Sequence, residues 1–126
     1  MPDDCEIAEA RDAAEFLTVF GAELAPVITG AVGTPGQSFL VLRRQGDTIG
    51  CVRVTQAAGT ACISGVSVLP EHRGQGFGRL ISAAAIEHAV RATGIAWLHC
   101  EDTVAPLYER LGLRRLTTHV DLEPKL

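Results

Sequence analysis

The sequence of 126 residues contains no apolar run long enough to cross a membrane, since a spanning helix needs roughly 18 such residues or more. Its first residues, MPDDCEIAEARD, lack the basic and apolar regions of a signal peptide. Basic residues are not in excess either, because the net charge is -4 and the pI about 5.5. These absences argue against membrane and nucleic-acid partners, and we expect a cytoplasmic protein.

Internal repeats, low-complexity tracts and cysteine pairs at C-x-x-C spacing are also missing. The four cysteines are Cys5, Cys51, Cys62 and Cys100, and three of them lie in apolar, strand-like runs. We expect buried free thiols rather than disulfides or metal ligands. The four histidines are scattered, so we predict no metal site. A length of 126 residues with 47% hydrophobic and 21% charged residues fits a single globular domain spanning 1–126.

The first third of the chain contains one strand pattern and one helix pattern. Residues 5–10 alternate apolar and polar side chains, as a half-buried strand does. Residues 11–24 form an amphipathic helix pattern. Its apolar face consists of Ala13, Phe16, Leu17, Phe20 and Leu24. Residues 26–37 are rich in glycine and proline, which predicts a loop or at most a broken helix.

Three strands are predicted next, at 38–45, 48–56 and 60–69. The first two form a hairpin around Gly46-Asp47, and a second turn follows at 57–60. Gly65 interrupts the third strand, which indicates a β-bulge.

The remaining chain alternates helices and strands. A helix is predicted at 78–93 with Gly94 as its C-terminal cap. Its buried side would consist of Leu80, Ala83, Ile86, Ala89 and Val90. The apolar run at 95–100 is typical of a strand covered on both faces. Trp97 would lie in the core or form a wall of the acceptor site. Pro106 opens a short helix at 105–111, and 114–122 is the last strand. The resulting order, β-α-β-β-β-α-β-α-β, predicts an α/β (α+β) fold with a mixed sheet and helices packed on it.

The segment PEHRGQGFGRLI, residues 70–81, lies between a predicted strand and a predicted helix. Glycine costs backbone entropy, so three glycines at alternate positions 74, 76 and 78 require a reason. The first N–H groups of a helix have no partner inside it, and the helix dipole adds partial positive charge. Glycines let a ligand approach this backbone closely, so the segment is suited to phosphate or pyrophosphate.

Two common phosphate motifs do not fit this segment. A Walker A loop would continue with lysine and serine or threonine, whereas Gly78 is followed by Arg79-Leu80. The dinucleotide pattern G-x-G-x-x-G fails as well, because its last position would be Arg79 or Ile81. The turn also follows the fourth predicted strand rather than the first.

The remaining pattern, R-x-x-G-x-G from Arg73 to Gly78 after Val66-Ser67-Val68-Leu69-Pro70, resembles the acetyl-CoA signature of the GNAT family of N-acetyltransferases. Residues 102–113, DTVAPLYERLGL, resemble that family's late block, Asn-x-x-Ala-x-x-Tyr followed by Leu-Gly-Phe. Asp102 stands in the asparagine place and Leu113 in the phenylalanine place. The element order also resembles the family over nearly the whole chain, which implies a GNAT-like, mostly antiparallel mixed sheet with helices on both faces.

The resemblance implies direct attack of an amine on acetyl-CoA, with both substrates bound together. The backbone of Val66, Ser67 and Val68 would pair with the pantetheine arm, and an N–H there would polarise the thioester carbonyl. Tyr108 would protonate the departing thiolate. Asp102 would contact the pantetheine amide or orient the acceptor. The pyrophosphate would be bound by Arg73, Gly74, Gln75, Gly76, Phe77, Gly78 and Arg79.

The acceptor ammonium, with a pKa near 10.4, must lose a proton before it attacks. Many family members use a glutamate on the strand before the loop, where this chain has Ser64 and Ser67. The candidates for the base are Glu71, His72, His99, Glu101 and Asp102.

The expected function is therefore an acetyl-CoA-dependent N-acetyltransferase acting on a small-molecule or peptide amine. The alternative is a non-catalytic acyl-CoA sensor or regulatory module. Only one strand is predicted beyond Gly112, where many relatives have two, and an open sheet edge invites pairing, so a homodimer is expected.

Overall fold

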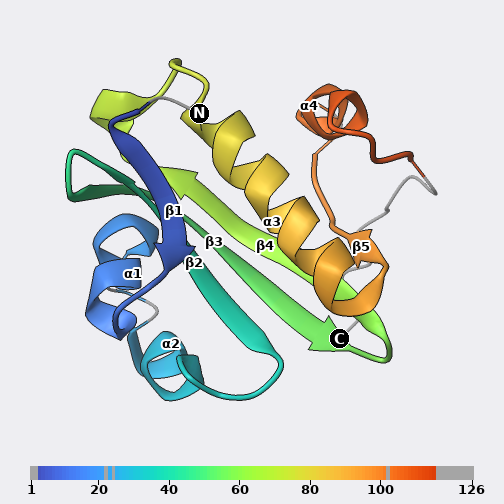
Figure 1. Ribbon diagram of the computed structural model, residues 1–126, viewed down its shortest axis with the longest axis horizontal. Coiled ribbons are helices and arrows are strands. Elements are labelled where there is room, and N and C mark those ends of the chain that lie inside the picture. Colours follow the sequence, from blue (N-terminus) through green and yellow to red (C-terminus); the bar gives the residue numbers. More distant parts are fainter. Residues whose placement is uncertain (1–2, 22, 24, 102, 116–126) are drawn as a thin grey trace, which may run out of the picture.

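The computed structural model describes residues 3–21, 23, 25–101 and 103–115 (Figure 1). Its elements follow in the order β1 (Cys5–Glu9), α1 (Ala13–Phe20), α2 (Ala25–Ala31), β2 (Gln37–Arg44), β3 (Asp47–Ala57), β4 (Thr60–Val68), the short 3-10 helix η2 (Pro70–His72), α3 (Phe77–Thr93), β5 (Ala96–Trp97) and α4 (Ala105–Arg110). The predicted last strand, 114–122, falls mostly outside the described residues.

The sheet keeps the order of the sequence, β1-β2-β3-β4-β5. The first four strands are antiparallel neighbours, and β5 pairs in parallel with β4 through Ala96 and Trp97. The two hairpins turn at Gln45-Gly46 and at Ala58-Gly59, where all four residues have positive φ. The predicted mixed, mostly antiparallel sheet is confirmed.

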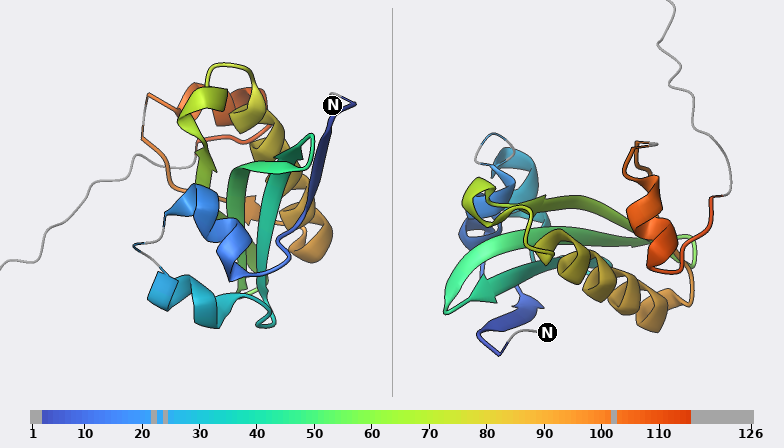
Figure 2. Two further views of the ribbon diagram at one scale, coloured as in Figure 1. Left: turned by 90° about the vertical axis from the view of Figure 1, so that its left-hand side faces the viewer. Right: turned by 90° about the horizontal axis from the view of Figure 1, so that it is seen from above.

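Helices cover both faces of this sheet. On one face α3 packs over a core that includes Leu42, Val52 and Ile81. On the other, α1 and α2 pack over a smaller core that includes Phe16 and Phe39, as the two side views in Figure 2 show. The chain therefore places its longest helix, with the glycine segment at its start, on one face alone.

A buried ion pair joins α1 to the sheet. Glu15 Oε2 on α1 lies 2.7 Å from Arg43 Nε on β2, and the Thr48 hydroxyl on β3 donates to the same oxygen. Both charged side chains are nearly buried, with 8% and 11% of their surface exposed. The Arg43 guanidinium holds the pKa of the Glu15 carboxyl well below its usual range, with help from Arg11, although burial acts in the opposite direction.

For the segment 26–37 the sequence predicted a loop or at most a broken helix, and the structure has a helix of seven residues, α2 at 25–31, followed by turns up to residue 36. Ile28 is fully buried against the core that contains Phe16 and Phe39. Burying such a side chain contributes roughly 1.5–3 kcal/mol, which exceeds the cost of about 1 kcal/mol for Gly30 inside a helix. Packing against α1 thus outweighs the local preference for a loop.

The predicted buried side of α3 is partly wrong. The fully or nearly buried side chains are Phe77, Ile81, Ser82, Ala85 and Ala89. Val90, by contrast, is 47% exposed. Apolar residues occur almost all round this helix, so the sequence pattern left its orientation undetermined. The small alanines at 85 and 89 face the sheet because they let the helix approach it closely.

The region around β5 is more open than expected. Ile95 and Trp97 are 55% and 39% exposed, so the prediction of a strand covered on both faces, with Trp97 in the core, is wrong for the described residues. Trp97 Nε1 donates to the Thr60 hydroxyl at 3.0 Å, and its ring meets His99 edge to face. These contacts give the indole a polar partner at the sheet margin without burying it.

The cysteines differ in burial in a way that the sequence did not indicate. All four are free thiols. Cys51 is fully buried, and burial raises the pKa of its thiol to about 12. Cys5 and Cys62 are only partly buried, and Cys100 is exposed, so the expectation of buried thiols holds for Cys51 alone.

Candidate functional site

The glycine segment forms the turn from β4 through η2 into α3. Gly74 and Gly76 have φ values of 77° and 86°, which glycine adopts without strain. Gly78 lies inside the helix and has no such conformation, and a Cβ placed there would meet no atom within 4 Å. Backbone conformation therefore explains the first two glycines. The third leaves open space at the start of α3.

The N-terminus of α3 has the features of an anion site. Gly76 is the N-cap, no described side chain caps the helix, and the first turn contains no acidic residue. The first N–H groups of a 17-residue helix therefore remain available, at the positive end of its dipole.

Two arginines stabilise the glycine segment in ways that differ from the sequence prediction. Arg73 Nε donates to the Val68 carbonyl at 2.9 Å and so ties the segment to the end of β4. Arg44 comes from β2, some thirty positions earlier in the chain. Its guanidinium lies 5.2 Å from the centre of the Phe77 ring and donates to Gln75. No local motif could have indicated Arg44, because only the sheet topology brings it here.

The second half of β4 has a free edge. From Ile63 onward β4 pairs with β3 on one side, whereas on the other side β5 pairs only with Ala61 and Cys62. Past Trp97 the chain leaves β4 and leads to α4 (Figure 1). The predicted segment Val66–Val68 therefore lies on a strand edge that is unpaired within the described residues.

The predicted bulge at Gly65 is confirmed. Between the pairs Arg53–Ser64 and Cys51–Ser67, β4 advances three residues while β3 advances two. Gly65 has φ 67°, and the ring of Phe20 lies directly against it. A Cβ at Gly65 would lie 2.7 Å from Phe20 Cε1. The sequence predicted Phe20 only as a core residue of α1, so its place beside the bulge is new.

The predicted residues fall into two groups in the structure. The segment from Val66 through Arg79 is continuous and joins the free edge of β4 to the start of α3. Tyr108 lies on the separate helix α4, beyond the point where the chain leaves β4, and is 9% exposed (Figure 1). Asp102 lies outside the described residues.

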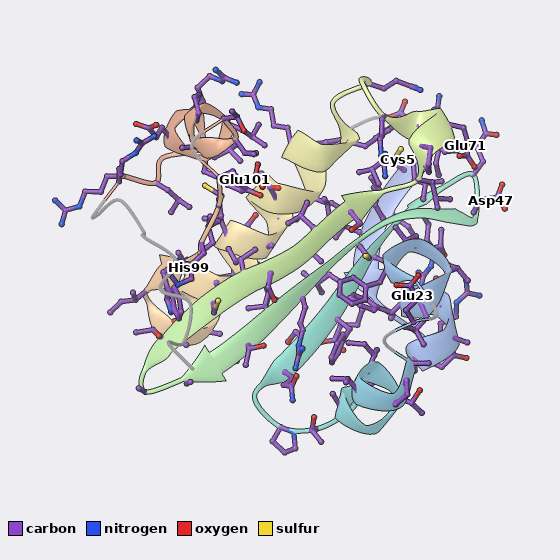
Figure 3. The ribbon with its side chains drawn as sticks, turned by 180° about the vertical axis from the view of Figure 1, so that it is seen from behind. Cys5, Glu23, Asp47, Glu71, His99 and Glu101 are labelled. Carbon is purple, nitrogen blue, oxygen red and sulfur yellow. The ribbon has the colours of Figure 1, made fainter. Side chains whose placement is uncertain are left out.

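The candidate bases also divide by position. Glu71 and His72 lie in η2, beyond the end of β4, and His72 Nδ1 is buried without a hydrogen-bond partner in the described part of the chain. His99 and Glu101 follow β5. Figure 3 shows Glu71 beside Asp47 at one end of the sheet, and His99 and Glu101 on the β5 side. The structure therefore divides the candidate bases into two groups by position, which the sequence alone could not do.

The described residues contain neither a metal-binding cluster nor a membrane-spanning helix. No group of three or more His, Cys, Asp or Glu side chains within the described ranges could hold a metal ion. None of the described helices is both long and apolar enough to cross a membrane.

Comparison with known proteins identifies a family. Residues 35–114 match the acetyltransferase (GNAT) domain family. A search of curated proteins gave no match. Among solved structures, a GCN5-related N-acetyltransferase from Kribbella flavida is 26% identical, with a TM-score of 0.69 over 89% of this chain. This chain spans 47% of that protein.

Two further structures match over nearly their full length. An acetyltransferase from Trypanosoma brucei is 24% identical, with a TM-score of 0.72 over 96% of this chain and 100% of its own. A transcriptional regulator from Bacillus halodurans C-125 is 18% identical, with a TM-score of 0.76 over 94% of this chain and 99% of its own. At such identities these two likenesses show the fold alone.

Proposed function

The chain belongs to the acetyltransferase (GNAT) domain family, and on this premise we propose that it transfers an acetyl group from acetyl-CoA to a primary amine. The observation that carries the proposal is the open start of α3. Gly78 has no conformational or packing reason to be glycine, and it lies at an uncapped helix N-terminus. A bound anion close to the backbone supplies that reason, because a Cβ would occupy its place.

The pyrophosphate of acetyl-CoA is the anion that we assign to this site. The N–H groups from Arg73 to Arg79 would bind its oxygens, and the dipole of α3 favours the negative charge. Arg79 is exposed and adds positive charge at the rim. Arg44 and Gln75 shape the loop from the other side through their hydrogen bond.

The free edge of β4 supports the placement of the pantetheine arm. An extended chain with amide groups can pair with an unpaired strand edge as an added strand does. Val66, Ser67 and Val68 would supply these backbone groups. An N–H beside the Gly65 bulge would donate to the thioester oxygen and stabilise the negative charge that develops there.

In the proposed reaction, the amine nitrogen forms a bond to the thioester carbon while both substrates are bound. The C–S bond then breaks, CoA leaves as a thiolate, and Tyr108 protonates the sulfur. The nitrogen loses its excess proton as the amide forms, and this proton restores the phenol of Tyr108 through solvent. A phenol pKa near 10 against a thiol pKa near 8.5 makes this transfer unfavourable by roughly 2 kcal/mol in water. The site must therefore stabilise the tyrosinate until it regains a proton. Asp102 would contact the pantetheine amide or orient the acceptor.

The acceptor ammonium must lose its proton first. Of the candidates, His99 and Glu101 follow β5 on the side of the sheet where the chain leaves β4, whereas Glu71 lies beside Asp47 at the other end. Of these two, Glu101 carries a carboxylate, the group that many relatives use for this step. In this proposal Glu101 accepts the proton from the acceptor ammonium, directly or through a water molecule.

One observation favours a second function, that of a non-catalytic acyl-CoA sensor. β4 presents Ser64 and Ser67 in the region where many relatives have a glutamate. A protein with this fold and no effective base would bind acetyl-CoA without turning it over.

The test combines binding and turnover. Acetyl-CoA binding is measured by calorimetry, and release of CoA thiol is followed with a broad panel of primary amines. The Tyr108→Phe variant should bind acetyl-CoA like the wild type and release CoA at least tenfold more slowly. Tight binding of acetyl-CoA without CoA release from any amine would establish the sensor instead.

A further inference from the structure

The ring of Phe20 covers the bulge of β4 on one face of the sheet. A Cβ placed on Gly65 would lie 2.7 Å from Phe20 Cε1, and 3.4 and 3.5 Å from Cδ1 and Cζ of the same ring. The edge of the ring therefore lies where a side chain at position 65 would begin. Phe20 is the last residue of α1, so the covered face is the one that carries α1 and α2 (Figure 2).

The core beneath α1 holds both the ring and the bulge in place. The centre of the Phe20 ring lies 5.1 Å from that of Phe16, which is fully buried and meets Phe39 edge to face at 5.0 Å. On the bulge itself, the thiol of the fully buried Cys51 donates to the Gly65 carbonyl at 3.6 Å. The position of the ring over Gly65 is therefore set by buried neighbours.

The opposite face of β4 is closed near the bulge. Ile63 and Val68 are buried in the core beneath α3, and Val66 packs against that core. Ser64 is exposed and, by the alternation along a strand, lies on the other face. A molecule that approaches this part of β4 from above or below the sheet therefore comes from the face on which Phe20 lies.

The direction of attack on the thioester brings the acceptor past this ring. In the proposed donor site the thioester oxygen accepts a hydrogen bond from the edge of β4, and hydrogen bonds between strands lie near the plane of the sheet. The carbonyl group then lies near this plane as well. A nucleophile reaches its carbon from above or below the plane, where the orbitals align. Because α3 closes one face, the amine arrives on the face of Phe20.

We propose that Phe20 restricts the acceptor to amines whose nitrogen is attached to an unbranched CH2 group. This inference rests on the proposed acetyl transfer, because it places the thioester at the edge of β4 beside Gly65. A chain added to that edge lies about 4.8 Å from β4, and carbon atoms do not approach closer than about 3.5 Å, so about 1.3 Å remains beside the ring. This space is shorter than one C–C bond.

The narrow space defines a class of acceptors. A CH2 group next to the nitrogen can turn a hydrogen atom toward the ring in several orientations. Each further carbon on that atom removes one of these orientations, and two further carbons leave none. The class therefore includes linear alkylamines and the side-chain amine of lysine. It excludes the α-amino groups of chiral amino acids, whose nitrogen is attached to a branched carbon.

The test compares amines that differ in branching. The probes are n-butylamine, sec-butylamine and tert-butylamine, which share one formula, and glycinamide and alaninamide, which differ by one methyl group. An acceptor found in the broad panel of amines is added together with its α-methyl homologue. CoA release from acetyl-CoA gives kcat/KM for each amine, and the uncatalysed reaction corrects for intrinsic reactivity. We expect the unbranched member of each set to have a kcat/KM at least tenfold higher than the branched ones.

Two variants of Phe20 and one control test the role of the ring. Phe20→Leu removes the ring but keeps an apolar side chain for the core, and Phe20→Ala opens the space further. In both, CoA release from the branched amines should become faster, and the preference should fall at least threefold. A loss of stability alone would slow every amine. Leu17→Ala should keep the wild-type preference, since Leu17 packs against the same core but lines the hollow between α1 and α2.

The outcomes separate this inference from the proposed function. The inference alone is overturned if the wild type releases CoA equally fast from branched and unbranched amines, if Phe20→Leu keeps the wild-type preference, or if Leu17→Ala loses it too. Absence of CoA release from every amine would reject the transferase, and with it this restriction on its acceptor.

Discussion

The ring of Phe20, at the end of α1, lies against the Cα of Gly65, in the bulge of β4. The contact joins a helix on one face of the sheet to the strand whose free edge carries the proposed thioester site. Phe20 in turn stacks on Phe16 at a ring distance of 5.1 Å, and Phe16 is fully buried. The shape of the bulge therefore depends on the packing of α1 as well as on the pairing of β3 and β4.

We predict that Gly65→Ala destabilises the protein through both backbone strain and this contact. Gly59 provides the control, because its φ of 76° is similar but a Cβ there would meet nothing within 4 Å. Gly59→Ala should lower the free energy of unfolding by about 1–2 kcal/mol, because alanine is strained in the left-handed backbone conformation. Gly65→Ala should lower the free energy of unfolding by about 1–3 kcal/mol more than Gly59→Ala does, since the added methyl group must displace the Phe20 ring. Urea unfolding of the two variants measures the difference, and equal losses would show that Phe20 moves aside freely.

A second prediction concerns Gly78. Alanine favours helix over glycine by about 1 kcal/mol, and the open space at Gly78 admits a methyl group. Gly78→Ala should therefore keep or raise the melting temperature, yet weaken acetyl-CoA binding at least tenfold because the methyl group blocks the approach of the pyrophosphate.

The control for that variant is Gly30→Ala, which adds a methyl group to α2 in equally open space. It should match Gly78→Ala in stability and bind acetyl-CoA like the wild type. Undiminished acetyl-CoA binding by Gly78→Ala, measured by calorimetry, would remove the start of α3 from the donor site.

Local signals explain which parts of the fold could be predicted from the sequence. The hairpin near Gly46, the bulge at Gly65, the end of α3 at Gly94 and the start of α4 near Pro106 all depend on the backbone preferences of one residue. The helix α2 and the orientation of α3 depend instead on contacts between distant segments. A short pattern carries no information on such contacts. For this reason the sequence left α2 open between a loop and a broken helix, and the predicted buried side of α3 was partly wrong.

The same distinction applies to the candidate site. The glycine segment is contiguous, so its motif could be recognised in the sequence. Arg44 and Phe20 come from β2 and α1, and only the tertiary fold brings Arg44 to the glycine segment and Phe20 to the bulge of β4. Each is an ordinary residue of an amphipathic helix or strand, so the sequence on either side of it did not indicate a role in the site.

The buried pair of Glu15 and Arg43 predicts how stability depends on pH. Since the pKa of folded Glu15 lies below its usual value of 4.5, the ionised carboxylate contributes stability that is fully present above pH 4.5. This stability is lost as the pH falls toward the folded pKa. Glu15→Gln should cost about 3 kcal/mol at pH 7, because it removes the main counter-charge of the nearly buried Arg43.

Urea unfolding at pH 7 and at pH 3 measures this contribution. The wild type should lose more stability between the two pH values than Glu15→Gln does, so that the difference between them shrinks at pH 3. Glu87→Gln, which breaks an exposed pair with Arg91, should change little at either pH, because solvent screens exposed pairs. If the difference in unfolding free energy between the wild type and Glu15→Gln stays the same at pH 7 and pH 3, the charge of the Glu15 carboxylate does not stabilise the fold. The role of Glu15 in holding α1 on the sheet would then lie in packing and neutral hydrogen bonds.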